Sequence, residues 1–163
     1  MNPTDGREGD AGAARRVLVI DLDELCWALG SRDPLGQSSH RLNLESGELL
    51  FLAEADALDE AIEDPRDDER WLCIEAIDSS EAFGIMENFV AQCDDSRLAR
   101  TLGQALQQRK PFRSFKDALA EHPAQREAWF AFERQAMEVI ARRWCIDHGI
   151  TPTWVGHRQP TSP

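Results

Sequence analysis

A change in hydrophobic periodicity near residue 78 constrains the fold of this chain more than any other feature. Before that point, apolar residues alternate with polar ones. In HRLNLESGELLFL, residues 40–52, two such runs flank a turn that contains a glycine, which is typical of a β-hairpin. RWLCIEAI, residues 70–77, alternates in the same way and predicts a third strand.

After residue 78, apolar residues recur every three or four positions, which predicts helices. Four such segments follow one another, at 78–93, 94–108, 109–119 and 123–148. We therefore expect an α+β fold, in which a small antiparallel sheet (the N-terminal hairpin plus the third strand) packs with a C-terminal layer of about four helices.

The beginning of the chain adds two short elements. VLVI, residues 17–20, is expected to be a strand or simply extended. In the next segment Asp21 and Glu24 have the spacing of a capping box, so a helix is expected to begin there. Gly30 is expected to stop that helix.

The two ends of the chain lack periodic apolar residues. Residues 1–14 are rich in Gly, Ala and Asp, and the last residues end in GHRQPTSP. Ordering such segments loses conformational entropy without burying apolar surface. We expect residues 1–14 to be a disordered tail, residues 15–152 a single α+β domain, and residues 153–163 a flexible tail.

The charge of the chain is negative but unevenly distributed. The net charge is -12, yet residues 1–95 hold 24 Asp and Glu against 7 Lys and Arg, while residues 96–148 hold 6 against 10. The whole-molecule field repels nucleic acid and anionic membranes. The halves, with net charges of -17 and +4, are complementary, which could steer intramolecular docking, head-to-tail self-association or binding of a basic protein partner.

The cysteines and the apolar runs indicate a compartment. Cys26, Cys73, Cys93 and Cys145 lack metal-ligand or redox spacing and lie among apolar neighbours, so we expect buried thiols in a reducing environment. The chain has no run of about 20 apolar residues that would span a membrane, and its start lacks the apolar core of a signal peptide. These observations predict a cytoplasmic protein without membrane contact.

RKPFRSFKDAL, residues 109–119, is the most basic stretch of the chain. Its aromatic residues Phe112 and Phe115 share one helical face with Leu119, so they are expected in the core rather than stacked on bases. The cations are expected to remain exposed as an interaction strip, whose target could be nucleic acid, an acidic partner protein or the acidic half of this chain. The strip consists of Arg109, Lys110, Arg113 and Lys116.

An acidic segment lies between the hairpin and the third strand. It lacks the spacing and the central glycine of a calcium-binding loop, and we expect a solvated, partly mobile loop, with an acidic surface for a protein partner as the alternative. Its carboxylates are Glu54, Asp56, Asp59, Glu60, Glu63, Asp64, Asp67, Asp68 and Glu69.

Other candidate sites have simpler structural explanations. Asp21, Asp23 and Glu24 could bind a divalent cation, but acids at a helix start are favoured without any metal. None of the histidines belongs to a recognisable triad or metal motif; they are His40, His122, His148 and His157. We expect no cofactor, no metal and no catalytic residue.

The order of these motifs resembles the bacterial uncharacterised protein family 0158. The resemblance covers about residues 17–150, and its most specific parts are FRSFKDAL and LNLESGEL. The family usually has Thr-Gly-Glu after an acidic residue in the turn, where this chain has Ser46, Gly47 and Glu48. The family also has tyrosines near the positions of Leu42 and Trp71. The resemblance implies a small cytosolic bacterial protein and no established activity.

Three functional hypotheses remain open. The leading one is a non-enzymatic, cytosolic interaction or regulatory module that acts through its charge asymmetry. The second is a nucleic-acid-associated regulator whose basic strip contacts phosphate. The third is a small metal-dependent enzyme whose site assembles only in the folded chain.

Overall fold

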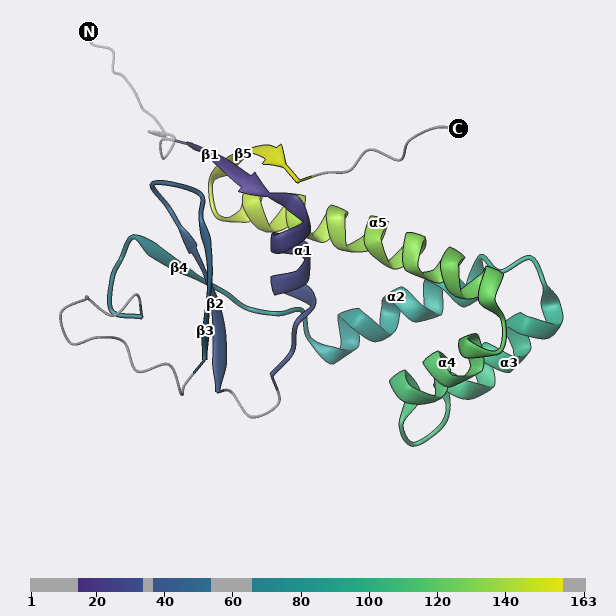
Figure 1. Cartoon of the computed structure of the whole chain (residues 1–163). Coiled ribbons are helices and arrows are strands. Elements are labelled where there is room, and N and C mark those ends of the chain that lie inside the picture. Colours follow the sequence, from purple (N-terminus) through teal and green to yellow (C-terminus); the bar gives the residue numbers. More distant parts are fainter. Residues whose placement is uncertain (1–14, 34–36, 54–65, 157–163) are drawn as a thin grey trace, which may run out of the picture.

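The computed structural model describes residues 15–33, 37–53 and 66–156, which form five strands and five helices (Figure 1). In chain order these elements are β1 (Arg16–Asp21), α1 (Leu22–Gly30), β2 (Ser38–Asn43), β3 (Leu49–Ala53), β4 (Trp71–Ile74), α2 (Ser79–Ala91), α3 (Ser96–Leu106), α4 (Pro111–Ala120), α5 (Pro123–Asp147) and β5 (Ile150–Val155).

The expected hairpin and third strand form one antiparallel sheet. Its strand order is β3-β2-β4, with Leu42 of β2 opposite Leu49 of β3 and Leu72 of β4. Leu42 is buried and Arg41 beside it is only partly buried, as the period of two requires. The prediction of a small antiparallel sheet is confirmed.

A second, parallel sheet joins the two ends of the described chain and was not predicted. β1 pairs with β5 from Arg16 opposite Ile150 to Asp21 opposite Val155. The expected flexible tail from residue 153 is therefore misplaced, because β5 continues to Val155. Local sequence patterns miss this strand because its partner lies at the far end of the chain. The expected tail at 1–14 lies outside the described residues.

The apolar residues form two cores rather than one continuous layer. The first joins both sheets and α1 to the C-terminal half of α5, with Ile20, Leu42 and Ile140 among its buried residues. The second joins α2, α3 and α4 to the N-terminal half of α5, around Phe115 and Trp129. The expected α+β fold is thus confirmed in its elements, but the sheets pack mainly against α1 and α5 rather than against one C-terminal layer of about four helices.

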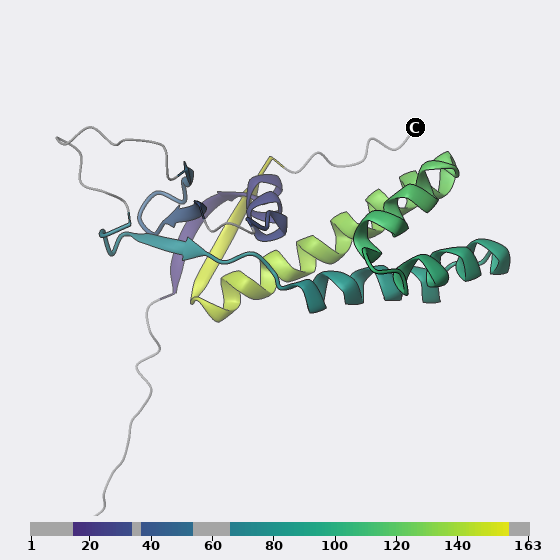
Figure 2. The same ribbon diagram turned by 90° about the horizontal axis from the view of Figure 1, so that it is seen from below.

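Helix α5 connects the two cores. Its 25 residues correspond to about 37 Å of helix, which is enough to contribute to both, and Figure 2 shows it running from the strands to α3 and α4. Helices α3 and α4 lie at the end of the molecule opposite the three-stranded sheet, and α2 runs from the middle of the molecule toward them.

The helix boundaries follow from local chemistry. The side chains of Asp21, Asp78 and Asp95 accept hydrogen bonds from backbone N–H groups in the first turns of α1, α2 and α3, which satisfies donors that lack helical partners. Helices α4 and α5 each begin with a proline. At the C-terminal ends, Gly149 follows α5 with φ 69°, whereas α1 includes Gly30 and ends one residue later than expected.

The cysteines are reduced but are not all buried. Cys145 is buried, Cys26 and Cys93 are partly exposed, and Cys73 is exposed on β4. The expectation of four buried thiols is therefore wrong for Cys73, because β4 is an edge strand and Cys73 lies on the side opposite the buried Ile74.

Gly47 in the hairpin turn explains the turn motif. Its φ is 81°, and a Cβ at this position would overlap the backbone carbonyl oxygen of Val19. The turn therefore packs directly against β1, and Arg16 reinforces this contact by donating from Nη1 to the carbonyl oxygen of Leu44 at 3.2 Å. Only glycine combines this conformation with this approach.

Replacing Gly47 with alanine should be much more destabilising than replacing Gly149. Both glycines have positive φ, but a Cβ at Gly149 would meet nothing within 4 Å. We expect Gly149→Ala to lower the free energy of unfolding by about 1–2 kcal/mol, the strain of a left-handed alanine, and Gly47→Ala to lower it by more, about 3 kcal/mol. Urea unfolding of both variants measures the difference, and equal losses would show that the turn does not press on β1.

Candidate functional site

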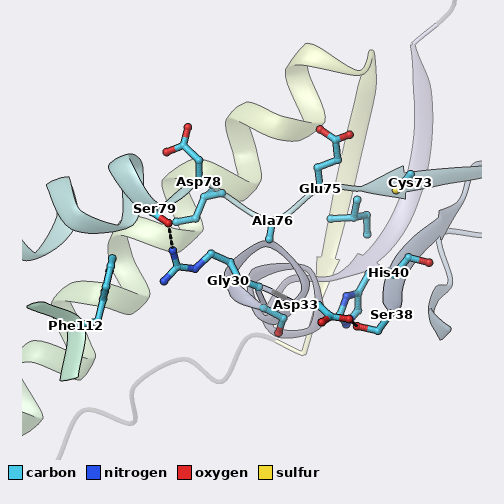
Figure 3. A pocket seen from close by; sticks show the side chains of 15 residues that line it. Gly30, Asp33, Ser38, His40, Cys73, Glu75, Ala76, Asp78, Ser79 and Phe112 are labelled. Carbon is cyan, nitrogen blue, oxygen red and sulfur yellow. Dashed lines mark hydrogen bonds between the residues drawn. The ribbon is translucent and has the colours of Figure 1, made fainter. Parts of the chain in front are cut away.

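Two adjoining cavities lie where the sheet side of the molecule meets the helical side. The larger has a volume of about 970 Å³ and the smaller about 560 Å³. Figure 3 shows the larger one, with residues from α1, β2, β4, α2 and α4 around it. The residues that line both cavities are Gly30, Ser31, Arg32, Ile77 and Phe112.

Arg32 stands between the two cavities. Its Nη1 donates to the hydroxyl of Ser79 at 2.5 Å, marked by the dashed line at Ser79 in Figure 3, and its guanidinium lies 4.7 Å from the ring centroid of Phe112. Among the described residues, no carboxylate forms an ion pair with it. Since guanidinium has five donors, Arg32 retains capacity to bind an anion.

The carboxylates of the larger cavity are mostly engaged locally. Asp33 accepts a hydrogen bond from the hydroxyl of Ser38 at 2.7 Å, and Asp78 caps α2 by accepting from the backbone N–H of Glu81. Glu75 is exposed. The acids of this cavity therefore chiefly hold the neighbouring segments in place.

His40 is the one buried polar side chain among the described residues, with 8% of its surface exposed. Its ring lies 5.0 Å from that of Trp27 and 4.9 Å from that of Phe51. Nε2 has no hydrogen-bond partner in the described part of the chain. Burial lowers the pKa of His40 from its usual 6.5 because a charged imidazole would lose its hydration.

His40 should make the protein less stable as the solution becomes acidic. Because its pKa is lower in the folded state, the unfolded chain binds the proton first, so the free energy of unfolding falls as pH drops below 6.5. The fall cannot exceed about 1.4 kcal/mol per pH unit, the limit for one proton. Urea unfolding between neutral pH and pH near 5 should give a weaker pH dependence for His40→Gln than for wild type. His122→Gln serves as the control, and identical pH profiles for wild type and His40→Gln would contradict the assignment.

The smaller cavity, called the groove below, combines apolar side chains with three cations, Arg32, Lys116 and Arg134, and two carboxylates, Asp23 and Glu133. Trp129 at its floor is only 2% exposed, whereas Trp27 and Phe130 at its edge are 62% and 44% exposed. The groove residues that carry the argument come from α1, α2, α4 and α5 and from the segment after α1. They are Trp27, Arg32, Ile85, Met86, Lys116, Trp129, Phe130, Glu133, Arg134 and Met137.

The charges of the groove are only partly compensated. Arg134 contacts Asp23 at 3.0 Å and Glu138 at 3.4 Å. Burial raises the pKa of Glu133, and the positive charge of Lys116 opposes that rise. No ion pair within the described residues involves Lys116. The indole N–H of Trp129 also finds no acceptor there, but the atom is buried, so the groups that the groove offers to a ligand are the side chains of Arg32 and Lys116 above an apolar floor.

The thiol of Cys26, which lines the groove, is expected to be unreactive. Burial, with further contributions from Glu138 and Asp23, raises the pKa of Cys26 to about 12. At neutral pH it is therefore a protonated thiol rather than the thiolate that attacks substrates. Cys26 acts as an apolar wall residue.

The structure separates the two parts of the predicted basic segment. Phe115 is fully buried and Phe112 partly buried, which confirms that the aromatics belong to the core. The four cations of the strip, Arg109, Lys110, Arg113 and Lys116, are all exposed. Arg113 lies 3.8 Å from Asp117, and only Lys116 lines the groove.

The predicted acidic surface is described only at its end. Glu54, Asp56, Asp59, Glu60, Glu63 and Asp64 lie outside the described residues. Asp68 contacts Arg70 at 2.7 Å, and hydrogen bonds from Arg70 lower the pKa of its carboxyl. Asp67 and Glu69 are exposed.

The acidic start of α1 serves the fold. Asp21 caps the helix, and Asp23 contacts Arg134. A Cβ at Gly156 would overlap the Asp21 carboxylate, so this side chain also contacts the end of β5. Across the described ranges, no group of three or more His, Cys, Asp and Glu residues could hold a metal ion.

The sequence analysis missed the groove. Its walls come from four helices, α1, α2, α4 and α5. The residues next to Arg32 and Arg134 in the sequence form no motif that indicates a binding site. One signal was present: Trp27 lies off the apolar stripe of its helix, and such a large exposed aromatic residue often marks an interaction surface.

Comparisons with known proteins agree on one relationship. A family model described as an uncharacterised protein family (UPF0158) matches residues 15–156. A Pseudomonas aeruginosa protein described as UPF0158 protein PA5073 is 35% identical over 150 residues, which cover 90% of this chain and 93% of that protein. No solved structure matches. In the described part of the chain, no helix combines the length and apolar character needed to cross a bilayer.

Proposed function

Because the chain belongs to the uncharacterised protein family UPF0158, whose description names no activity, we propose its function from its surface. The protein is a non-enzymatic cytoplasmic interaction or regulatory module. Its groove binds an acidic segment of a protein partner, with apolar side chains of the segment on the floor and carboxylates at the rim.

The observation that carries this proposal is the combination of apolar and cationic groups in one groove. Trp27 and Phe130 are large, exposed and aromatic, and Met86 and Met137 line the same cavity. Aromatic residues and arginine dominate the binding energy of many interfaces, and methionines adapt to varied partners. A groove of about 560 Å³ also has the size of a typical binding pocket.

The rim cations favour an acidic partner segment over a neutral or basic one. Arg32 is held by Ser79 and Phe112, and Lys116 is exposed at the end of the strip. Complementary charges raise the association rate and exclude wrong partners.

Reversing the charge of Lys116 should separate binding from folding. Lys116→Glu changes an exposed side chain, so the melting temperature should stay within about 2 °C. Its affinity for acidic amphipathic peptides should fall about tenfold or more. Fluorescence titration with a panel of such peptides measures the affinities. Arg100→Glu, the same charge change on the exposed surface of α3, should bind like wild type.

Two results would contradict the proposed function. One is equal binding by wild type and Lys116→Glu. The other is an equal loss in Arg100→Glu, because it would mean that only the overall charge of the protein matters and that no groove is involved.

A second candidate function is contact with phosphate through the strip. Four exposed cations within eight residues favour it. The burial of Phe115 removes the aromatic platform that single-stranded nucleic acid uses, and the net charge of -12 opposes any polyanion. Binding of RNA or DNA at physiological salt that is lost in Arg109→Ala/Lys110→Ala but kept in Lys116→Glu would favour this candidate.

A further inference from the structure

The groove matches the acidic segment of this same chain. Resting on the proposed function, we infer that residues 54–69 of a second copy bind in the groove, so that two copies associate by exchanging their acidic segments. The segment EADALDEAIEDPRDDE contains nine carboxylates and a single arginine. Leu58, Ala61 and Ile62 recur in it at the spacing of one helical face.

The chemistry of the two partners is complementary in kind. The rim of the groove presents Arg32 and Lys116, neither of which forms an ion pair with a carboxylate within the described residues. The floor and edge present Trp129, Phe130 and Trp27. An amphipathic acidic segment can place Leu58 and Ile62 against the aromatic surface and its carboxylates at the rim, the usual mode of recognition of a helix in a groove.

The attachment of the segment favours a second molecule as its receptor. Nη2 of Arg66 lies 3.5 Å from the carbonyl oxygen of Ala53, so the described residues on either side of 54–65 contact each other beside the three-stranded sheet. Twelve residues with joined ends extend outward by no more than about 20 Å. Figure 1 places the three-stranded sheet toward one end of the molecule and α4 toward the other, so a segment attached to the sheet meets Lys116 of α4 more readily on a second copy than on its own.

Charge and symmetry favour a closed pair. Residues 1–95 carry a net charge of -17 and residues 96–148 of +4, so two copies that meet in opposite orientations place each acidic half beside a basic half. If each copy donates one segment and receives one, the arrangement has twofold symmetry and does not grow into a filament. At physiological salt the repulsion between the net charges is screened beyond about 8 Å, whereas contacts within the groove persist.

The test measures the mass of the full chain by light scattering over a range of micromolar to submillimolar concentrations. Wild type and Arg100→Glu should shift toward a dimer as concentration rises. The Leu58→Asp/Ile62→Asp variant should remain monomeric because its segment has lost the apolar residues that bind the groove. The Lys116→Glu variant should also remain monomeric because its groove has lost a cation at the rim. Mixing these two variants should restore association, since one intact segment then meets one intact groove. Two variants that had merely misfolded would not complement each other.

A synthetic peptide of residues 54–69 distinguishes the remaining outcomes. It contains no tryptophan, so tryptophan fluorescence reports on the protein alone. It should bind the Leu58→Asp/Ile62→Asp chain at least about tenfold more tightly than a peptide carrying the same two substitutions. The inference is overturned if the wild-type chain is monomeric at every concentration. A segment that binds the groove of its own chain would give this result. If unrelated acidic peptides still bind, the proposed function survives; if none binds, both fail.

Discussion

Replacing Phe115 with alanine should lower the free energy of unfolding by about 3–5 kcal/mol, the usual effect of deleting a buried aromatic side chain. Phe115 is 0% exposed, and its ring centroid lies 4.9 Å from that of Trp129 and 6.3 Å from that of Phe89. Both pairs have the edge-to-face geometry that adds to the effect of burial. The loss is a large share of the total stability of a domain this size, so the variant should express poorly and melt well below wild type.

Phe112→Ala is the matched control for this prediction. Phe112 lies one turn earlier on the same helix but is only partly buried, against Phe83 and Arg32. It should lose clearly less stability than Phe115→Ala in urea unfolding. If the two variants lose the same amount, the assignment of Phe115 to the centre of the second core is wrong.

A chain that ends at Gly149 should fail to fold cooperatively. Such a truncation removes β5 and with it the backbone pairing along all of β1. It also removes Ile150, which is buried, and uncovers Leu18 and Ile20 on β1. The unpaired backbone groups of β1 would then lie beside an opened core, where unsatisfied polar groups are costly. Circular dichroism on heating should show retained helix but no sharp transition.

A chain that ends at Gly156 is the control. It keeps β5 and the contact between Gly156 and the carboxylate of Asp21. Its melting temperature should stay within about 2 °C of the full chain. A sharp, near-native melting transition in the chain that ends at Gly149 would show that the parallel sheet contributes little to stability.

Sequence patterns predicted the elements that depend on neighbours in sequence. The hairpin at residues 40–52, the helix cap at Asp21 and the burial of Phe115 follow from spacings of two to four residues, and the structure confirms them. The parallel pair β1–β5 was missed because Arg16 and Ile150 are opposite each other only in the folded chain. ITPTWV also contains a proline, which weakens a strand prediction.

The groove could not be predicted for a related reason. Lys116 was identified as an exposed cation. Its place in a binding groove, however, depends on Arg32 and Trp27, which come from a distant part of the sequence. Helix α5 contributes residues to both cores and to the groove. It therefore connects the parts of the chain that supply Trp27, Arg32 and Lys116. Residue types alone therefore revealed the charges of the site but not the surface that they surround.

Because β1 pairs with β5, the order in which the ribosome adds residues determines which part of the protein can fold first. At about 5–20 residues per second, the ribosome needs on the order of 10 s to add the residues that separate β1 from β5. During that time Leu18 and Ile20 on the nascent chain have no completed sheet to enter. The helical core around Phe115 and Trp129 draws on a continuous stretch of sequence and can assemble first. The molecule is thus closed by its last strand, and a chain released early by the ribosome would present an open, aggregation-prone edge.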